Sequence, residues 1–328
     1  MKDALSRLDK LTTLETQTIV AETRTVVAET QTVVAETQIT AAEILVGVKA
    51  LESSGQFDRV AISSLESKVV KLLDMQVVRD IKSWLSAPDP STSHSNVLKT
   101  RHRGTGSWFL EGKTFADWKT SNNSVFWIYG SPGSGKSVLC SSIIDMLAPT
   151  SSLAYFYCDF RDTQTQNARG LLSSLVSQLS VVSSESLDIL RRVHRDNSGV
   201  PNGALLFASL SEMSDVSGDV FIIIDALDEC TGSAERAEIL EYLERLVKLD
   251  RPQLHVLVAS RPEADIQSCM MRMKTHQLDL QAVEEQAEDL RLYVSYQLEK
   301  MKWDNILVLA AFDKLTAKAN GSYVQFHF

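Results

Sequence analysis

Apolar residues gather in short runs from residue 124 onward, and the stretches between the runs carry apolar residues at helical spacing. Uninterrupted apolar runs are typical of strands buried on both faces, and the helical stretches fit the crossovers that join parallel strands. The pattern therefore predicts an α/β fold with a parallel sheet flanked by helices. The predicted strands are Val125–Tyr129, Leu153–Cys158, Val220–Ile224 and Leu254–Ala259.

The pattern changes after Pro262, where the apolar runs stop and no further strand is predicted. Val283–Leu298 and Ile306–Lys318 instead carry helical spacing, so residues 266–328 are expected to form a partial helical lid. The sequence then ends in Ser322–Phe328 without an obvious finishing element.

Residues 1–50 contain a near-perfect seven-residue repeat over 18–38, built on the sequence T-V-V-A-E-T-Q. Seven residues is the coiled-coil period. The repeat nevertheless places Thr or Glu where a second apolar seam is needed, and its β-branched residues weaken a helix. We predict a heptad-repeat helix, which is either a spacer without a specific partner or a site of self-association or of binding to a helical partner.

A second helical segment precedes the α/β pattern. Apolar residues between Ile62 and Trp84 recur every three or four positions, which predicts an amphipathic helix. Prolines and small polar residues over 86–93 then predict a linker or extended connector, with a domain boundary near 86–100. The predicted organisation is a heptad-repeat helix at 1–50, a helix and linker at 56–100, the α/β domain at 101–265 and the lid at 266–328.

A glycine-rich segment lies between the strand Val125–Tyr129 and a predicted helix at Val138–Leu147. It has the pattern G-x-x-x-x-G-K-S of a phosphate-binding loop, in the strand, loop and helix context that such a loop requires. A chance match by a glycine- and serine-rich turn is the alternative, and the context argues against it. The residues expected to bind nucleotide are Gly130, Ser131, Pro132, Gly133, Ser134, Gly135, Lys136 and Ser137.

The chemistry of this loop requires a nucleotide, ATP or ADP, together with Mg²⁺. Glycines allow successive backbone N–H groups to point at phosphate oxygens, and the following helix adds the positive end of its dipole. Lys136 is expected to neutralise the outer phosphates, and Ser137 is expected to ligate the metal. The chain contains no N-K-x-D guanine signature, so ATP is favoured over GTP.

Carboxylates follow the apolar strand Val220–Ile224. Asp225 ends the strand, on what we expect to be a neighbour of the phosphate-loop strand, and is predicted to hold the magnesium shell. Asp228 and Glu229 come next, where either is placed to polarise a water for in-line attack on the γ-phosphate, and Glu229 is preferred. The alternative for this pair is a structural role at the start of the predicted helix Ala234–Leu246.

Arg261 follows the last predicted strand. Arginine is suited to bidentate contacts with phosphate, so we predict that Arg261 senses the γ-phosphate. The alternative is an ordinary surface arginine before a proline. His255 lies within the same strand and is expected to be a packed core or edge residue rather than a ligand.

The composition is that of a globular protein of 328 residues, 44% hydrophobic and 23% charged. A net charge of −9 argues against a broad basic surface for nucleic acid or anionic lipid. No apolar stretch reaches the length of a membrane span and the N-terminus lacks a signal peptide's apolar core, so a cytoplasmic location is expected. The cysteines lack metal-binding spacing and are expected to be buried, reduced thiols: Cys140, Cys158, Cys230 and Cys269.

The segments GSPGSGKS, FIIIDALDEC and HVLVASRP together resemble the NACHT class of signal-transduction P-loop NTPases. The resemblance is strongest to the nephrocystin-like N-terminal NTPase module that is frequent in fungal NOD-like receptor proteins. It extends upstream to Arg103–Phe109 and downstream to Lys318–Ser322, and covers roughly residues 60–325.

This resemblance implies an ATP-driven molecular switch, in which a sheet domain and helical lid are followed by a sensor of ankyrin, tetratricopeptide or WD-type repeats. It implies that Asp225 is the magnesium carboxylate, that the small Ala226 leaves room at the metal, and that Lys136 contacts phosphate. It also suggests that Thr105 and Gly106 approach the adenine end. The sequence ends before any sensor repeats, so we expect a truncated product.

Function classes remain open at this point. The first hypothesis is a slow Mg-dependent ATPase that acts as a conformational switch. The second is a nucleotide-binding interaction scaffold with negligible hydrolysis. A nucleic-acid motor is disfavoured, because the sequence supplies neither a second motor core nor a basic track.

Overall fold

The computed structural model describes residues 46, 67–68, 75–102, 104–149, 151–197, 199–273 and 275–300. The chain divides into two compact units, Met1–Asp80 and Ile81–Phe328, and the account below concerns the second unit. Its elements are α3 (Ser91–Thr100), α4 (Ser107–Leu110), α5 (Lys113–Thr120), β1 (Ser124–Tyr129), α6 (Lys136–Leu147), β2 (Ser152–Tyr157), η1 (Thr163–Thr165), α7 (Ala168–Leu179), α8 (Ser184–Asp196), α9 (Gly203–Val216), β3 (Val220–Asp225), η2 (Leu227–Glu229), α10 (Ser233–Lys248), β4 (Leu254–Ser260), α11 (Ala264–Arg272), β5 (His276–Asp279) and α12 (Glu284–Lys300).

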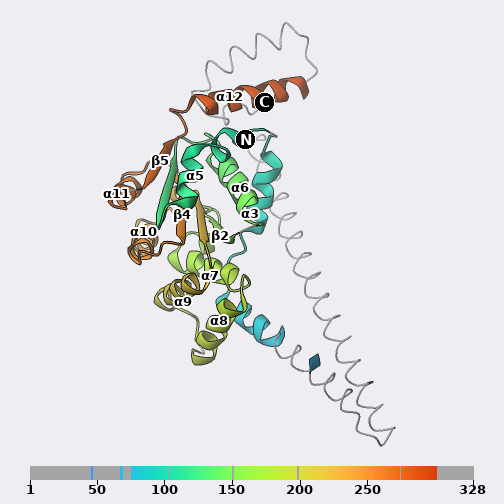
Figure 1. The fold of residues 1–328 in the computed structure, drawn as a ribbon, viewed down its shortest axis with the longest axis vertical. Coiled ribbons are helices and arrows are strands. Elements are labelled where there is room, and N and C mark those ends of the chain that lie inside the picture. Colours follow the sequence, from blue (N-terminus) through green and yellow to red (C-terminus); the bar gives the residue numbers. More distant parts are fainter. Residues whose placement is uncertain are drawn as a thin grey trace, which may run out of the picture. The chain divides into compact units, whose positions relative to one another are not determined.

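The centre of this unit is a parallel sheet of five strands in the order β2-β3-β4-β1-β5 (Figure 1). Every pairing is parallel, with Tyr157 opposite Asp225 and Tyr129 opposite Ser260 near the carboxyl ends of the strands. All the carboxyl ends therefore meet at one edge of the sheet, which is where parallel α/β folds place their ligand sites. The predicted fold class is confirmed.

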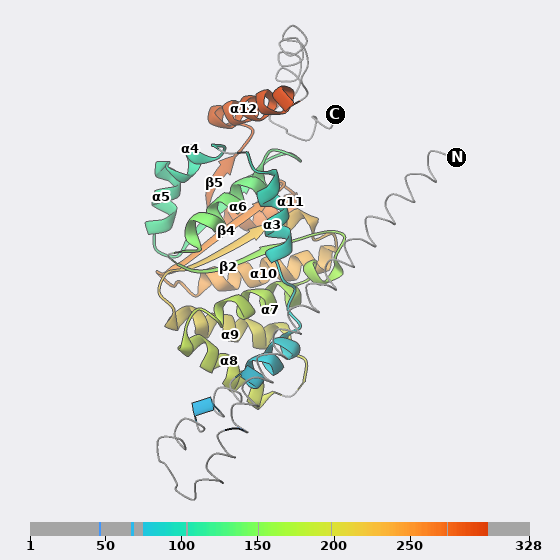
Figure 2. The ribbon, with the colours of Figure 1, turned by 90° about the vertical axis from the view of Figure 1, so that its right-hand side faces the viewer.

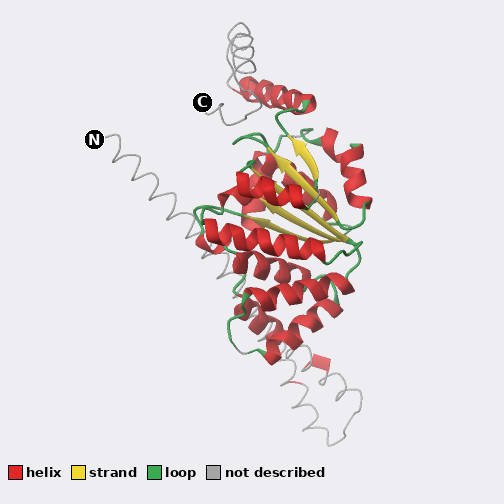
Figure 3. Cartoon of the chain, turned by 90° about the vertical axis from the view of Figure 1, so that its left-hand side faces the viewer, coloured by secondary structure: helices red, strands yellow, loops and turns green. Residues whose placement is uncertain are grey.

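Helices cover both faces of the sheet (Figure 3). Alternate residues of each strand point to opposite faces. On β1, Phe126 and Ile128 pack in a cluster with α4, α5 and α6, whereas Val125 and Trp127 join the larger cluster beneath α7, α9, α10 and α11. Because both faces are buried, each central strand is apolar along its whole length, which is the pattern that the sequence carries.

Two expectations about the sheet are wrong. The prediction that strands stop after Pro262 missed β5, which pairs with β1 at the sheet edge. Its sequence His276-Gln277-Leu278-Asp279 is polar and partly exposed, so it lacks the apolar run that marks a buried strand. The strand that ends in Asp225 was also expected to be the neighbour of β1, but β4 lies between them. Crossover connections leave strand order unreadable from local patterns.

The linker prediction was correct only in part. Residues 86–90 lie outside helices, but α3 begins at Ser91, so the predicted extended connector over 86–93 is shorter than expected. α3 packs along α6 (Figure 2) and is held there by His94, whose Nδ1 lies 2.9 Å from the Tyr157 hydroxyl. Arg101, just after α3, forms an ion pair with Asp145 of α6.

The other sequence predictions in this region are confirmed. The predicted strands match β1 to β4 within a residue or two, and the predicted helices at 138–147, 234–246 and 283–298 match α6, α10 and α12. All four cysteines are buried free thiols that form no disulfide bond. His255 is a core residue, 2% exposed, with Nδ1 at 2.7 Å from the Ser124 hydroxyl.

Several predictions fall outside the described residues. These are the heptad-repeat helix, apart from Val46, and the helix at Ile306–Lys318. The predicted domain limits stay predictions. Within the described part of the chain, no helix is long and apolar enough to cross a membrane.

Candidate functional site

The glycine-rich segment forms a tight loop between β1 and the first residue of α6. Gly133 and Gly135 have φ angles of +72° and +89°, in the left-handed region where a side chain is strained. Gly135 is the N-cap of α6, so the positive end of the helix dipole faces the loop. A Cβ at Gly130 would lie 2.8 Å from the Ser134 hydroxyl, so a larger residue at this position would displace that side chain.

Lys136 folds over this loop. Its Nζ donates hydrogen bonds to the carbonyls of Gly130 and Ser131, at 3.0 and 2.9 Å. Burial lowers the pKa of Lys136, and the nearby carboxylates of Asp228 and Asp225 oppose that shift. The ammonium group therefore lies at the mouth of the loop, within the field of the acidic residues that follow β3.

Asp225 lies at the carboxyl end of β3 and is only 2% exposed. Its Oδ1 is buried without a hydrogen-bond partner among the described residues. Burial raises the pKa of its carboxyl group to about 6, although a hydrogen bond from Ser137 and the charge of Lys136 act in the opposite direction. Burying a carboxylate with one unpaired oxygen costs free energy unless a cation binds to that oxygen.

Asp228 and Arg261 are paired with each other. The Arg261 backbone N–H donates to Asp228 Oδ1 at 2.9 Å, and Arg261 Nε lies 3.0 Å from Asp228 Oδ2. The Asp228 side chain is 7% exposed and the Arg261 side chain is 47% exposed. Both oxygens of Asp228 are therefore occupied by the residue that follows β4.

Glu229 has a different environment. Its Oε2 accepts a weak hydrogen bond of 3.4 Å from the backbone N–H of Phe160, in the loop after β2. Burial raises the pKa of Glu229, and neighbouring carboxylates led by Asp159 raise it further. The turn that delivers Asp228 and Glu229 passes through Ala226, whose φ of +56° is unusual for a residue with a side chain.

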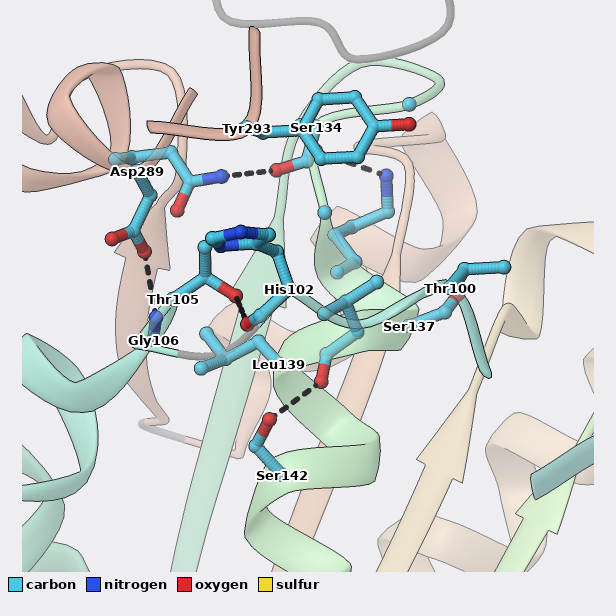
Figure 4. Close-up of a pocket in the computed structure, with 15 residues that line it drawn as sticks. Thr100, His102, Thr105, Gly106, Ser134, Ser137, Leu139, Ser142, Asp289 and Tyr293 are labelled. Atoms are coloured by element: carbon cyan, nitrogen blue, oxygen red, sulfur yellow. Dashed lines mark hydrogen bonds between the residues drawn. The ribbon is translucent and has the colours of Figure 1, made fainter. Parts of the chain in front are cut away.

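A cavity of about 240 Å³ opens beside the phosphate loop (Figure 4). One end is formed by loop residues Gly133–Ser137, and the other by the segment before α4 and by α12. Thr105 and Gly106, which were expected near the adenine, do line this cavity. The cavity is not lined by Asp225, Asp228, Glu229 or Arg261. The charges of Asp225, Asp228 and Arg261 nevertheless act on Lys136, which does line it.

Helix α12 is attached to both sides of the cavity. The Gln286 amide donates to the Ser134 carbonyl at 2.7 Å. Asp289 Oδ2 accepts from the Gly106 backbone N–H at 2.6 Å and from the Trp108 indole N–H at 3.0 Å. Burial raises the pKa of Asp289, whereas these two donors act to lower it.

Sequence reasoning missed part of this cavity. His102, Gln286, Asp289 and Tyr293 were not singled out, because none of them belongs to a recognisable motif. The spacing of the three α12 residues, at positions 286, 289 and 293, places them on one helix face. The helical spacing over 283–298 was therefore the available sequence signal for these cavity residues. Periodicity predicts a helix, but it does not show against which part of the protein the helix packs.

A parallel sheet with a glycine-rich loop between β1 and α6, Lys136 over that loop, and a buried carboxylate after β3 define an α/β P-loop NTPase. Comparison with known proteins narrows this class. Residues 104–261 match the family described as Nephrocystin 3, N-terminal. The vegetative incompatibility protein HET-E-1 of Podospora anserina is 29% identical over 241 residues, which is 66% of this chain and 17% of that protein.

Residues 104–261 are therefore similar to the nephrocystin-like NTPase module of fungal NOD-like receptor proteins. Solved structures similar to it include Drosophila ORC bound to DNA, at 14% identity and a TM-score of 0.41, covering 69% of this chain and 55% of that one. The Aeropyrum pernix ORC1 protein in complex with DNA has 14% identity and a TM-score of 0.40, with 70% and 56% covered. The chain thus spans little more than half of each.

Proposed function

We propose that this module is an ATP-binding conformational switch with slow, Mg-dependent hydrolysis. The observation that carries the proposal is the position of Asp225, a buried carboxylate with an unpaired oxygen that receives a hydrogen bond from Ser137 at the start of α6. Phosphate binding alone would need only the loop. A second, metal-binding group beside the loop supports the chemistry of a nucleoside triphosphate.

Residues Gly130–Ser137 would hold the phosphates. Backbone N–H groups of the loop and the N-terminus of α6 favour negative charge, and Lys136 would exchange its bonds to loop carbonyls for phosphate oxygens. The Ser137 hydroxyl and Asp225 would hold Mg²⁺, and the unpaired Oδ1 of Asp225 fits that role. When bound, the metal neutralises phosphate charge.

Glu229 is our choice as the residue that accepts a proton from the attacking water. Its oxygens are held only weakly, by the Phe160 backbone, and its raised pKa brings it closer to the range in which a general base works. Asp228 instead positions Arg261. Arg261 would reach the γ-phosphate with its guanidinium group, while Asp228 fixes its backbone.

Helix α12 would link nucleotide to the rest of the protein. It contacts the phosphate loop through Gln286 and the opposite wall of the cavity through Asp289. Nucleotide that fills the cavity changes the surroundings of both contacts, so α12 has different interactions in the empty and filled states. Contacts of α12 that depend on nucleotide in this way support the proposal that the module is a conformational switch.

The first experiment identifies the nucleotide that the purified protein retains, and measures Mg-ATP binding. The variant Lys136→Ala is expected to retain no nucleotide on purification. Its affinity for Mg-ATP is expected to fall at least tenfold. Lys248→Ala is the matched control, because Lys248 lies on α10 and pairs with Glu244 away from the loop. If the wild-type protein retains no nucleotide and binds none during magnesium titration, the proposal is wrong.

The second experiment separates a switch that hydrolyses ATP from a nucleotide-binding scaffold. Multiple-turnover phosphate release by the wild type, lost in Glu229→Gln while Mg-ATP binding persists, supports hydrolysis. Tight binding without turnover by the wild type supports the scaffold. Asp228→Asn is the matched comparison, and we expect it to weaken turnover less than Glu229→Gln does.

Residues 1–50 are proposed to mediate self-association or binding to a helical partner. The support is the seven-residue repeat at 18–38. Sedimentation of the full chain at several concentrations, with and without substitutions in the repeat, tests this proposal. No interaction with nucleic acid is proposed, because the net charge of −9 disfavours a basic surface.

A further inference from the structure

The end of the cavity away from the phosphate loop has one polar group that its surroundings do not satisfy. Several cavity-lining side chains there already have partners. The hydroxyls of Thr100, Thr105 and Ser142 each donate to a backbone carbonyl. Gln286 and Asp289 are held by their bonds to the loop and to the segment before α4. The exception is His102 Nδ1, which is buried without a hydrogen-bond partner among the described residues.

His102 is held in place on several sides. Its carbonyl accepts hydrogen bonds from the Thr105 hydroxyl at 2.8 Å and the Thr105 backbone N–H at 3.3 Å. Its ring packs against Tyr296 of α12, with the ring centroids 4.4 Å apart. Figure 4 shows the imidazole among Thr105, Leu139 and Tyr293, within the cavity.

We propose that His102 is a nucleotide-binding residue that hydrogen-bonds the base of the bound nucleotide. The inference rests on the proposed function, because phosphates on Gly133–Ser137 leave the His102 end of the same cavity for the nucleoside. A buried polar atom without a partner costs free energy, and a ligand that supplies the partner recovers it. The edges of a purine carry both donors and acceptors, and a neutral imidazole nitrogen pairs with either.

Nδ1 is covered in the ligand-free structure, so pairing requires a turn of the ring about its Cβ–Cγ bond. That torsion is soft for histidine. The flat ring of Tyr293 and the apolar Leu139 line the cavity and provide surfaces suited to an aromatic base. His102 therefore combines a hydrogen-bonding edge with a stacking environment, which the phosphate end of the cavity does not offer.

The test compares Mg-ATP with Mg-tripolyphosphate by calorimetric titration of the full chain. Tripolyphosphate has the phosphates of ATP without the nucleoside. His102→Ala is expected to weaken ATP binding by about tenfold, the equivalent of one hydrogen bond of about 1.4 kcal/mol, and to leave tripolyphosphate binding within about twofold. His102→Asn, which keeps a polar atom near the place of Nδ1, is expected to recover part of the loss.

His276→Ala is the matched control, since His276 lies on β5, is exposed and does not line the cavity. It should leave both affinities unchanged. The proposal is overturned if His102→Ala weakens ATP and tripolyphosphate equally or weakens neither. A wild type that binds neither ligand overturns the proposed function itself, which is a distinguishable result.

Discussion

At the scale of single residues, Asp225 lowers the stability of the empty protein. A carboxyl pKa of about 6 in the folded state, against about 3.9 in the unfolded state, means that the native state binds its proton more tightly. The contribution of Asp225 to stability is therefore highest below the unfolded pKa and falls as pH rises toward 6, by about 3 kcal/mol in total. This is the free-energy cost of burying the carboxylate that we propose as a magnesium ligand.

The variant Asp225→Asn removes this cost. Without nucleotide, we expect its free energy of unfolding at pH 7.5 to exceed that of the wild type by about 2–3 kcal/mol. Urea titrations at pH 4.5 and 7.5 measure the gain, which should be small at the lower pH. The same variant should lose Mg-dependent ATP binding. Equal stability of the two proteins at pH 7.5 would contradict the assigned burial cost.

His255 imposes a pH dependence of the opposite sign. Burial beside Ser124 lowers the pKa of its ring below the usual value near 6.5. The folded state thus favours the neutral ring, so stability present above pH 6.5 is lost as the pH falls. Thermal unfolding at pH 7.5 and 5.5 should show a larger loss for the wild type than for His255→Asn. Parallel losses in both proteins would show that another group is responsible.

At the scale of elements, the start of α7 is set by a close backbone approach. Asn167 caps the helix through the Gly170 N–H at 2.8 Å, and a Cβ at Gly170 would lie 1.8 Å from the Gln164 carbonyl oxygen. Gly170→Ala should therefore destabilise the protein by about 1–3 kcal/mol, although alanine is the better helix former. Gly218→Ala is the control, because nothing lies within 4 Å of its added Cβ. Urea unfolding of both variants checks the difference, and equal stabilities would contradict it.

The elements that sequence patterns identified are those whose pattern is set by burial. β1 to β4 are apolar throughout because both of their faces are covered, and the phosphate loop is fixed by backbone geometry that only glycine allows cheaply. β5 escaped notice because an exposed edge strand needs no apolar run. The order of strands also escaped, because it depends on crossovers and not on local sequence.

The same distinction holds for the candidate site. Lys136 and Asp225 stand next to recognisable elements, so their proximity followed from the α/β pattern. The pairing of Asp228 with Arg261 depends on side chains from two different strand ends. The contacts of Gln286 and Asp289 join residues 152 and 183 positions apart. Contacts between residues so far apart produce no periodic pattern in a single sequence, so they could not be predicted from it.

At the scale of the whole molecule, ligand binding should raise stability through mass action. A ligand that binds only the folded state adds about 2.7 kcal/mol at a concentration one hundred times its Kd. We therefore expect saturating Mg-ATP to raise the melting temperature of the wild type by several degrees and to raise that of Lys136→Ala clearly less. Differential scanning fluorimetry measures both, with Lys248→Ala as the control that should respond like the wild type. An equal shift in the Lys136→Ala variant would place the ligand elsewhere.

The bond between Asp289 and Gly106 also has a consequence for biosynthesis. The 183 residues that separate the two ends take about 10 to 40 s to synthesise at ordinary elongation rates of about 5–20 residues per second. During that time the phosphate loop has left the ribosome but the far wall of its cavity has not. A nascent chain can thus complete this cavity only after α12 emerges, which would make capture of the proposed nucleotide a late event in the life of each new molecule.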